Sequence, residues 1–528
     1  MVRTEYSAVR KTEVRGFFVS LFNMFLVLFF VLSLLITLIV VAALLAHEKG
    51  KAKHASPGVI KDDHKGFESS LRPMSCDVVV VGGGISGMYM AETLMRMKKE
   101  DSVCLFEKDS RFGGRIFDYR FSQAPNISIS LGAWRVDREH KRVMALTKRF
   151  NIPMLKMDIK DAHWETRGVF VSSAQALKEQ AFPTLLSGPF ANMTLSEMKK
   201  YAWMNITREK TLEFPAYRDF LCHQLGSEGC EFSMAMYTVK RIYGEESTLF
   251  RYERNEALSS DSYDYYRPPG GLSHIVSALE RSAKLLGVKM YAMEKVKAIH
   301  RKGNLFTVDT DNFTVSARKL IIAVPTTPFE EISGDVAADI KRNTFFEDIL
   351  PLPAFKAVAL YSYPWWENIT SLHNLTLKPL ERFFSGASCL VGIMPYSGRG
   401  LHGEAVLQLS YSWRACAVKW GELSKLPKAV LESELKKAIQ EVFPGAVLPE
   451  PLDMMFKYWE KVAWHYTKAG SKISRYDLMK WAKRPFLGED VFIVGEAYSV
   501  FAGWNEGAFQ SAYNALKEGW KITQPEAY

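Results

Sequence analysis

The chain has 528 residues, of which 48% are hydrophobic and 24% are charged, and this balance excludes an intrinsically disordered protein. The length exceeds that of a typical single core and indicates two domains behind an N-terminal extension. The net charge of +10 comes from basic residues spread along the chain with acids between them, so no basic run indicates nucleic-acid binding.

The N-terminal segment is predicted to anchor the protein in a membrane. No charged residue occurs between Gly16 and Ala46, and this stretch exceeds both the roughly 20 residues that cross a bilayer and the apolar part of a cleavable signal. Positively charged residues flank this apolar segment on both sides, so the charge distribution barely decides its orientation in the membrane. We interpret residues 1–15 as a cytoplasmic tail, 16–46 as a transmembrane signal anchor and 47–74 as a stalk.

Six glycosylation sequons favour one orientation. They begin at Asn126, Asn192, Asn205, Asn312, Asn368 and Asn374, which is more than chance would supply. They predict a single-pass type II membrane protein whose body lies in a lumen or outside the cell. Disulfides could form there, and Cys222 with Cys230, eight residues apart in a predicted loop, is the favoured pair. No cysteine or histidine cluster indicates a metal site.

Ordered structure is expected from Cys76 onward, and it starts with a strand, a helix and a second strand. Asp77–Val81 is a short β-branched run that is typical of a buried parallel strand. Ile85–Met97 has helical spacing, and Ser102–Glu107 resembles the first strand. These three segments predict a βαβ unit.

Strands of the same character recur far along the chain, at Arg318–Val324 and at Asp490–Val494, and Gly507–Trp520 is a predicted helix. The predicted fold class is therefore α/β (α+β), with a Rossmann-like nucleotide-binding domain and an interleaved substrate domain in the body, residues 75–528. Residues of about 75–129, 261–334 and 471–528 would form the first domain. Residues of about 130–260 and 335–470 would form the second.

A glycine motif joins the first strand to the helix. Gly82 allows a tight turn, Gly84 lets the backbone approach a pyrophosphate, and Gly87 lets the helix pack against the strand. The helix N-terminus at Ile85 and Ser86 would supply N–H groups to the phosphates. Glu107, twenty residues after Gly87, would accept hydrogen bonds from ribose hydroxyls. The alternative is a structural turn with an incidental surface glutamate.

Glu107 through Arg115 resembles the E-x-x-x-R-x-G-G-R signature of the flavin-containing amine oxidases. Further similar segments follow in order at Pro269–Leu272, Val296, Ala323–Pro325, Gly495–Glu496 and Gly503–Ala508. The resemblance covers nearly all of residues 76–525 and implies that the nucleotide is FAD. One departure is Asp109, where many relatives have an arginine.

The resemblance also implies roles for single residues. Arg115 would reach a phosphate, Val296 would contact adenine, and Glu496 would hold the ribityl chain. The other implied cofactor-binding residues are Lys108, Arg111, Gly114, Gly132, Ala133, Trp134, Arg135, Gly503 and Trp504. The mitochondrial monoamine oxidases attach flavin through a cysteine shortly before the last strand. No cysteine follows Cys416 here, so noncovalent FAD is expected.

The substrate class depends on Leu131–Val136 and the following Arg138–Arg142. This stretch is similar to one in the L-amino-acid oxidases, where the arginine at the position of Arg135 forks onto the substrate carboxylate, a geometry that suits a guanidinium. The alternative is a surface arginine in an ion pair. Trp134 replaces a methionine of that pattern.

The resemblance supplies four further catalytic candidates beside Arg135. Lys356 would hold a water near the flavin and assist reoxidation, unless it is a lysine snorkelling from a strand. Trp504 would form an aromatic wall, and Trp464 and Tyr466 would complete the cage or belong to the core. Two family features depart from the pattern: Asn255 stands where a histidine base is expected, and no tyrosine near 393–396 clearly assists Arg135.

The resemblance thus implies oxidative deamination of an L-amino acid to a keto acid, ammonia and hydrogen peroxide, with molecular oxygen as the second substrate. The alternatives are a primary amine or polyamine oxidase, an amino-acid 2-monooxygenase, or a non-catalytic flavoprotein with a binding role. The expected partners are a small amino acid or amine, oxygen, and the membrane through one N-terminal helix. The oligomeric state stays open, a homodimer included.

Overall fold

The computed structural model describes residues 71–157, 163–236, 244–257, 264–369, 371–372, 375–376, 382–385 and 388–526. The predicted tail, the membrane anchor and nearly all of the stalk lie outside the described residues. Within the ranges given, no helix combines the length and the apolar character needed to cross a membrane. The expected start of order at Cys76 was wrong by a few residues, because Arg72–Ser75 already pair with Phe313–Ser316.

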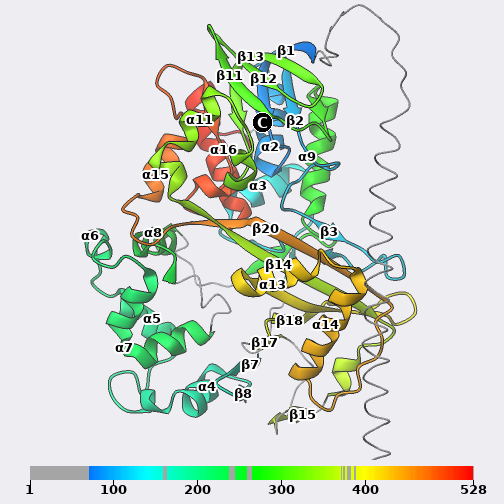
Figure 1. Ribbon diagram of the computed structural model, residues 1–528, viewed down its shortest axis with the longest axis vertical. Helices are drawn as coiled ribbons and strands as arrows, with labels where there is room; N and C mark the ends of the chain where they lie inside the picture. Colours follow the sequence, from blue (N-terminus) through cyan, green and yellow to red (C-terminus); the bar gives the residue numbers. More distant parts are fainter. Residues whose placement is uncertain are drawn as a thin grey trace, which may run out of the picture. The chain divides into compact units, whose positions relative to one another are not determined.

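A seven-stranded sheet joins segments from both ends of the chain (Figure 1). Its path is β10 (Lys289–Tyr291), β2 (Val103–Phe106), β1 (Arg72–Val81), β13 (Phe313–Ile322), β12 (Leu305–Asp309) and β11 (Ala298–Lys302), and β21 (Val491–Ile493) also pairs with β13. Strands β10, β2, β1, β13 and β21 are joined by parallel pairings, and β11 to β13 by antiparallel ones. The buried strands predicted at distant positions therefore share one sheet.

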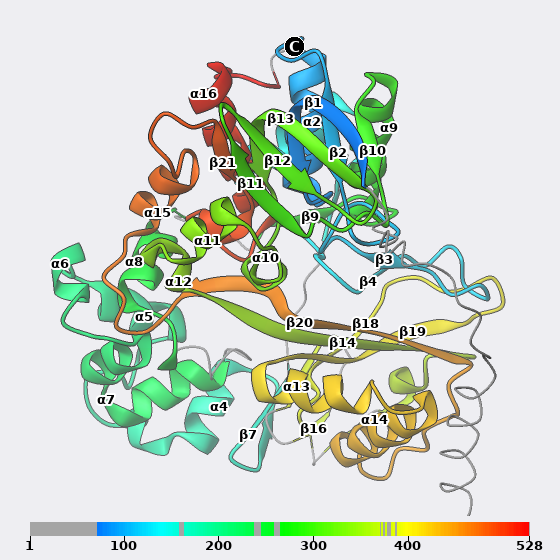
Figure 2. The ribbon, with the colours of Figure 1, turned by 45° about the horizontal axis from the view of Figure 1, so that its top comes forward.

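Helices cover both faces of this first sheet (Figure 2). On one face lie α2 (Ile85–Arg96), α9 (Ser273–Leu285) and α16 (Asn505–Trp520), and on the other α11 (Asp335–Lys341) and α15 (Arg475–Ala482). Val80 belongs to the same buried cluster as Leu279 and Leu516 on the first side, and Val79 shares a cluster with Ile340 on the second. Coverage on two sides explains why these strands are apolar throughout rather than alternating.

The second sheet carries the long strands of the chain. Its order is β20 (Asp453–Thr467), β14 (Ile349–Tyr361), β19 (Ala405–Trp413), β18 (Val391–Pro395), β17 (Phe383–Ser385), β7 (His163–Thr166) and β8 (Val169–Val171). Helices α13 (Arg414–Leu423) and α14 (Lys428–Val442) pack against it through Trp420 and Leu435, which share a buried cluster with Phe355.

Strand β20 breaks its register opposite β14. Leu352 pairs with Trp464, yet Ala354, two residues later, pairs with Trp459. The extra residues between the two tryptophans form a bulge that bends the strand.

The remaining elements are short or helical. The short strands are β3 (Asp118–Tyr119), β4 (Ile129–Ser130), β5 (Val136–Asp137), β6 (Leu155–Lys156), β9 (Tyr265–Arg267), β15 (Ser371–Leu372) and β16 (Leu375–Thr376). The helices are α3 (Lys141–Arg149), α4 (Ala174–Ala181), α5 (Leu195–Trp203), α6 (Arg208–Thr211), α7 (Tyr217–Met236), α8 (Thr248–Ala257), α10 (Thr326–Glu330) and α12 (Thr344–Glu347). Three-residue-per-turn helices occur at η1 (Pro183–Leu186), η3 (Trp365–Asn368) and η4 (Glu496–Tyr498).

All six cysteines of the chain are paired. The disulfides are Cys76–Cys104, which links β1 to β2, Cys222–Cys230, and Cys389–Cys416. The predicted pair Cys222–Cys230 is confirmed, but its predicted loop was wrong, because both residues lie in α7. Gly226 breaks that helix with a φ of 70°, which brings the two Cα atoms to 4.8 Å.

Candidate active site

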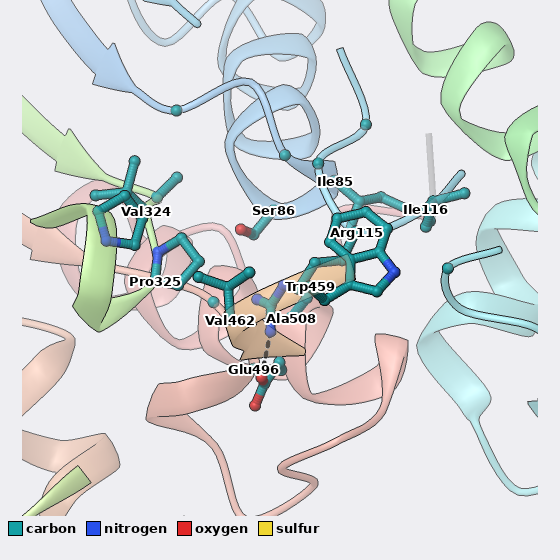
Figure 3. Close-up of a pocket in the computed structure, with 18 of the residues that line it drawn as sticks. Ile85, Ser86, Arg115, Ile116, Val324, Pro325, Trp459, Val462, Glu496 and Ala508 are labelled. Carbon is teal, nitrogen blue, oxygen red and sulfur yellow. Dashed lines mark hydrogen bonds and ion pairs between the residues drawn. The ribbon is translucent and has the colours of Figure 1, made fainter. Parts of the chain in front are cut away.

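A cavity of about 380 Å³ lies at the carboxyl ends of β1, β2 and β13, where it also meets β14, β19 and β20 of the second sheet. Its lining includes most of the predicted site residues, namely Gly82, Gly84, Ile85, Ser86, Glu107, Lys108, Gly114, Arg115, Gly132, Ala133, Val296, Lys356, Trp464, Glu496, Gly503 and Trp504. Five predicted residues do not line it: Gly87, Arg111, Trp134, Arg135 and Tyr466. Figure 3 shows the wall around Arg115 and Glu496.

The glycine turn has the geometry that a pyrophosphate needs. Gly82 has a φ of 101°, and a Cβ there would lie 2.8 Å from the carbonyl oxygen of Ala323. A Cβ on Gly87 would lie 2.1 Å from the carbonyl oxygen of Gly82, so this glycine permits close packing rather than ligand contact. A Cβ on Gly84 would meet nothing closer than the carbonyl oxygen of Ala323 at 4.0 Å, and this glycine precedes α2 without a side-chain cap. The first N–H groups of α2 are therefore available to an anion.

Glu107 is fixed at the cavity wall by the backbone. Its carboxylate accepts hydrogen bonds from the N–H groups of Gly83 at 2.8 Å and Asp109 at 2.9 Å. Burial raises the pKa of Glu107 even though these bonds oppose the shift. The side chain is positioned to accept hydrogen bonds from a hydroxyl-bearing ligand.

Arg111 does not face the cavity, which corrects its expected direct contact with the cofactor. Its guanidinium donates to the carbonyl oxygens of Gly114 at 2.6 Å and Ile116 at 2.9 Å. Gly114 has a φ of 55°. Arg111 therefore holds the second glycine turn in place from behind.

Arg115, Glu496 and His465 form a hydrogen-bonded cluster at the cavity wall (Figure 3 shows the first two). Arg115 donates to Oε1 of Glu496, and Nδ1 of His465 lies 2.7 Å from the same oxygen. Burial raises the pKa of Glu496, but His465 and Arg115 outweigh this effect and lower it to about 2. Glu496 is thus an ionised acceptor at neutral pH. His465 was not predicted from the sequence, and no motif marks it.

Lys356 reaches the cavity from β14 and is almost fully buried. Its Nζ donates to the carbonyl oxygens of Ser130 at 3.0 Å and Gly132 at 2.8 Å. The pKa of Lys356 falls to about 7 through burial, with Arg135 adding to the shift and Asp118 opposing it. Lys356 is therefore a buried lysine and does not snorkel to the surface.

Two tryptophans form aromatic walls of the cavity, but the third cage candidate does not. Trp464 and Trp504 line it, and Gly503 leaves room beside the Trp464 ring. The Tyr466 ring is edge-on to Trp464 at 6.2 Å, and its hydroxyl donates to Glu245 at 2.9 Å. Tyr466, two residues further along β20, points to the same side of the strand as Trp464 but lies beyond the cavity lining.

Arg135 lies beside the lining in an aromatic box. Its guanidinium carbon is 3.9 Å from the centre of the Tyr265 ring, 5.2 Å from Trp134 and 5.7 Å from Trp504. Among the residues that the structure describes, no carboxylate forms an ion pair with Arg135. The alternative of an ion-paired surface arginine is therefore not what the structure shows.

Asn255 is exposed on α8 and does not line the cavity, so its assignment to the position of a base was wrong. The neighbouring Arg254 points inward and donates to the Ala502 carbonyl at 3.3 Å. Tyr411, which was not predicted, lines the cavity with its ring centre 4.4 Å from Nζ of Lys356. Tyr411 stands opposite Lys356 in the pairing of β19 with β14, and no sequence motif marks it.

The residues at this cavity fit FAD. Gly84 would admit a pyrophosphate, Glu107 and Glu496 accept hydroxyl hydrogen bonds, and Val296 supplies an apolar surface. Because every cysteine is in a disulfide, no thiol remains for a covalent link.

Comparisons with known proteins agree with this fit. The chain is 21% identical to aplysianin-A of Aplysia kurodai over 86% of this chain and 92% of that protein, and 24% identical to achacin of Lissachatina fulica over 84% and 93%. It is 22% identical to the L-amino-acid oxidase of Mus musculus over 90% of this chain and 73% of that protein.

The fold is similar to that of putrescine oxidase bound to putrescine, with a TM-score of 0.61 and 16% identity over 84% of this chain and 99% of that one. The family model described as flavin containing amine oxidoreductase matches residues 85–515. The chain therefore belongs to the flavin-containing amine oxidoreductases, FAD-dependent enzymes that act on CH–NH2 groups.

Proposed function

We propose that the protein is an L-amino-acid oxidase that converts its substrate to a keto acid, ammonia and hydrogen peroxide. The observation that carries this proposal is Arg135, a half-buried guanidinium enclosed by aromatic rings with no carboxylate partner in the described part of the chain. A cation held this way next to the cavity wall at Trp504 is best balanced by an anionic group of a ligand. Amino acids carry such a group, whereas simple amines do not.

The name of the mouse relative, L-amino-acid oxidase, supports the same substrate class. The likeness to putrescine oxidase concerns the fold alone. That fold accommodates different substrates, so the residues at the cavity have to discriminate between them.

The charges around the cavity also favour the reactive form of an amino acid. Bound FAD supplies a two-electron acceptor that takes a hydride from the substrate carbon and is reoxidised by molecular oxygen. Loss of the hydride requires a neutral amine, and the nearby cations Arg135 and Lys356 disfavour an ammonium group. No strong base is needed for this effect, which agrees with the exposed position of Asn255.

The cavity walls have two further tasks in this proposal. Trp464 and Trp504 exclude water and hold the substrate between flat surfaces. Lys356, fixed by two carbonyl oxygens, places a positive charge beside the reacting groups and holds the water that assists reoxidation. Overall, the amino acid loses two electrons and two protons to oxygen, and water replaces the imine nitrogen.

Two organisational predictions belong to the same proposal. Segments 75–129, 261–334 and 471–528 would form the FAD domain, and 130–260 with 335–470 would form the substrate domain. Residues 16–46 would anchor the protein as a type II membrane protein, with its body in a lumen or outside the cell. Five of the six sequon asparagines lie within the described ranges, and all five are exposed. The three disulfides also suit an oxidising compartment.

A screen for hydrogen peroxide release tests the function directly. The purified body is incubated with each of the twenty L-amino acids and with the amines that their decarboxylation would give. Peroxide and ammonia in equal amounts with at least one amino acid support the proposal. Peroxide with amines alone would indicate a primary amine or polyamine oxidase, an amide product would indicate a 2-monooxygenase, and no turnover would indicate a binding role.

A further inference from the structure

The two oxygens of the Glu496 carboxylate have different surroundings. Oε1 is shared by Arg115 and by Nδ1 of His465 at 2.7 Å. Oε2 accepts, within the described part of the chain, only a long bond of 3.3 Å from the N–H of Gly503. Glu496 lines the cavity, so Oε2 retains capacity for a ligand.

His465 contacts Glu496 from outside the cavity. It belongs to β20, is completely buried, and does not line the cavity itself. Burial lowers the pKa of His465, which leaves the ring neutral, with one proton. Because the ionised carboxylate can only accept, that proton lies on Nδ1, and Nε2 has no hydrogen-bond partner in the described residues.

A single arginine would not distinguish the two carboxylate oxygens. The terminal torsion of a glutamate is broad and roughly two-fold, so the group turns easily and exchanges its oxygens. A second donor to the same carboxylate oxygen, here His465, fixes the orientation of the carboxylate and so distinguishes its two oxygens. The strand that carries His465 is rigidly paired, with Pro351 of β14 opposite His465.

We propose that His465 is a positioning residue for the cofactor. Together with Arg115 it occupies Oε1, and it thereby presents Oε2 to the cavity as the acceptor for a hydroxyl group of bound FAD. The ligand group must be a donor, because an ionised carboxylate has no proton to give. This inference rests on FAD binding and is independent of the proposed amino-acid substrate.

Loss of the His465 contact should weaken FAD binding without abolishing the fold. Hydrogen bonds to charged groups are the stronger class, so His465→Ala should raise the dissociation constant of FAD about tenfold or more. His465→Asn keeps an N–H donor close to the position of Nδ1 and should restore the affinity to within about threefold of the native protein.

The test removes the flavin, returns FAD in steps and follows the quenching of flavin fluorescence. It uses His465→Ala, His465→Asn, Glu496→Gln and the double variant His465→Ala/Glu496→Gln, and the melting temperature of each apoprotein reports folding. Thr467→Val is the matched control, because Thr467 is also buried on the same strand and, among the described residues, forms no hydrogen bond with Glu496. It should bind FAD like the native protein.

The double variant separates positioning from general packing. If His465 acts through Glu496, the double variant binds FAD as weakly as Glu496→Gln alone. Independent, additive losses would overturn the proposal, and so would unchanged affinity in His465→Ala. Should His465→Ala fail to fold, the asparagine variant decides, because a folded His465→Asn with affinity reduced tenfold or more contradicts the proposal.

Discussion

The guanidinium of Arg135 lies against the face of Tyr265, with 3.9 Å between the central carbon and the ring centre. This contact fixes the plane of the guanidinium and leaves its N–H edges directed away from the ring. Tyr265 and Trp504 are themselves stacked at 6.1 Å. Trp504 at the cavity wall is thus connected through Tyr265 to Arg135, the residue that we propose binds the substrate carboxylate.

Replacing Arg135 by lysine should impair the enzyme selectively. Lysine keeps the charge but loses two-pronged pairing, which costs about 1.5–3 kcal/mol, or roughly 10- to 150-fold in kcat/KM. The loss should appear with amino acids and be much smaller with the decarboxylated amines. Steady-state kinetics on both substrate sets measure it. Arg138→Lys is the control, since Arg138 pairs with Asp264 at the surface, and equal losses on both sets would mean that Arg135 is structural.

Reoxidation by oxygen should depend on the charge of Lys356. Its pKa of about 7 leaves the amine charged below that pH and neutral above it. If the charge assists electron transfer to oxygen, the reoxidation rate falls as pH rises through about 7. Stopped-flow mixing of the anaerobically reduced protein with oxygen measures this rate. Lys356→Met should be slow and nearly independent of pH, whereas a variant as fast as the native protein would exclude this role.

The flavin should be released when the protein unfolds. All six cysteines are in disulfides, so a thioether to the cofactor has no thiol to form from. Acid precipitation of the yellow protein should leave FAD in the supernatant, identified by its absorbance spectrum and by chromatography. Yellow colour that remains in the precipitate would contradict noncovalent binding.

Glycans should be present at the exposed sequons if the body is luminal or extracellular. Asn192, Asn205 and Asn368 are exposed, and within the described ranges their side chains form no hydrogen bond that a glycan would break. The amides of Asn126 and Asn312, in contrast, donate to Arg399 and Glu294. Enzymatic deglycosylation should increase gel mobility, and peptide mass spectrometry should find higher occupancy at the first three sites. Protein from a eukaryotic host with no glycan at any site would refute the predicted orientation.

The nucleotide-binding half of the fold could be predicted because its signals are local. The strand ending at Val81, the glycine turn and the helix from Ile85 follow one another in the sequence, and their spacing alone specifies the βαβ unit. Glu107 and Glu496 were found in the same way, at the ends of strands or beside glycines.

The substrate side could be predicted only in part, because much of it depends on pairing between distant strands. Trp459 and Trp464 are five apart, so strand alternation would put them on opposite faces, yet both line the cavity. The bulge between them changes the direction of β20 and was invisible in the sequence. The same strand pairing determines the positions of Tyr466, Tyr411 and His465. These positions became clear only with the register of β14, β19 and β20.

The residues that meet at the cavity are separated in time as well as along the chain. Gly82 is synthesised roughly 400 residues before Glu496, an interval of about 20–80 s at ~5–20 residues per second. For most of that interval β13, a neighbour of β1 in the sheet, has not yet been synthesised. After β13 has been made, its other parallel neighbour β21 is still missing. A nascent chain therefore cannot complete the site before the segment that carries Glu496 has been made.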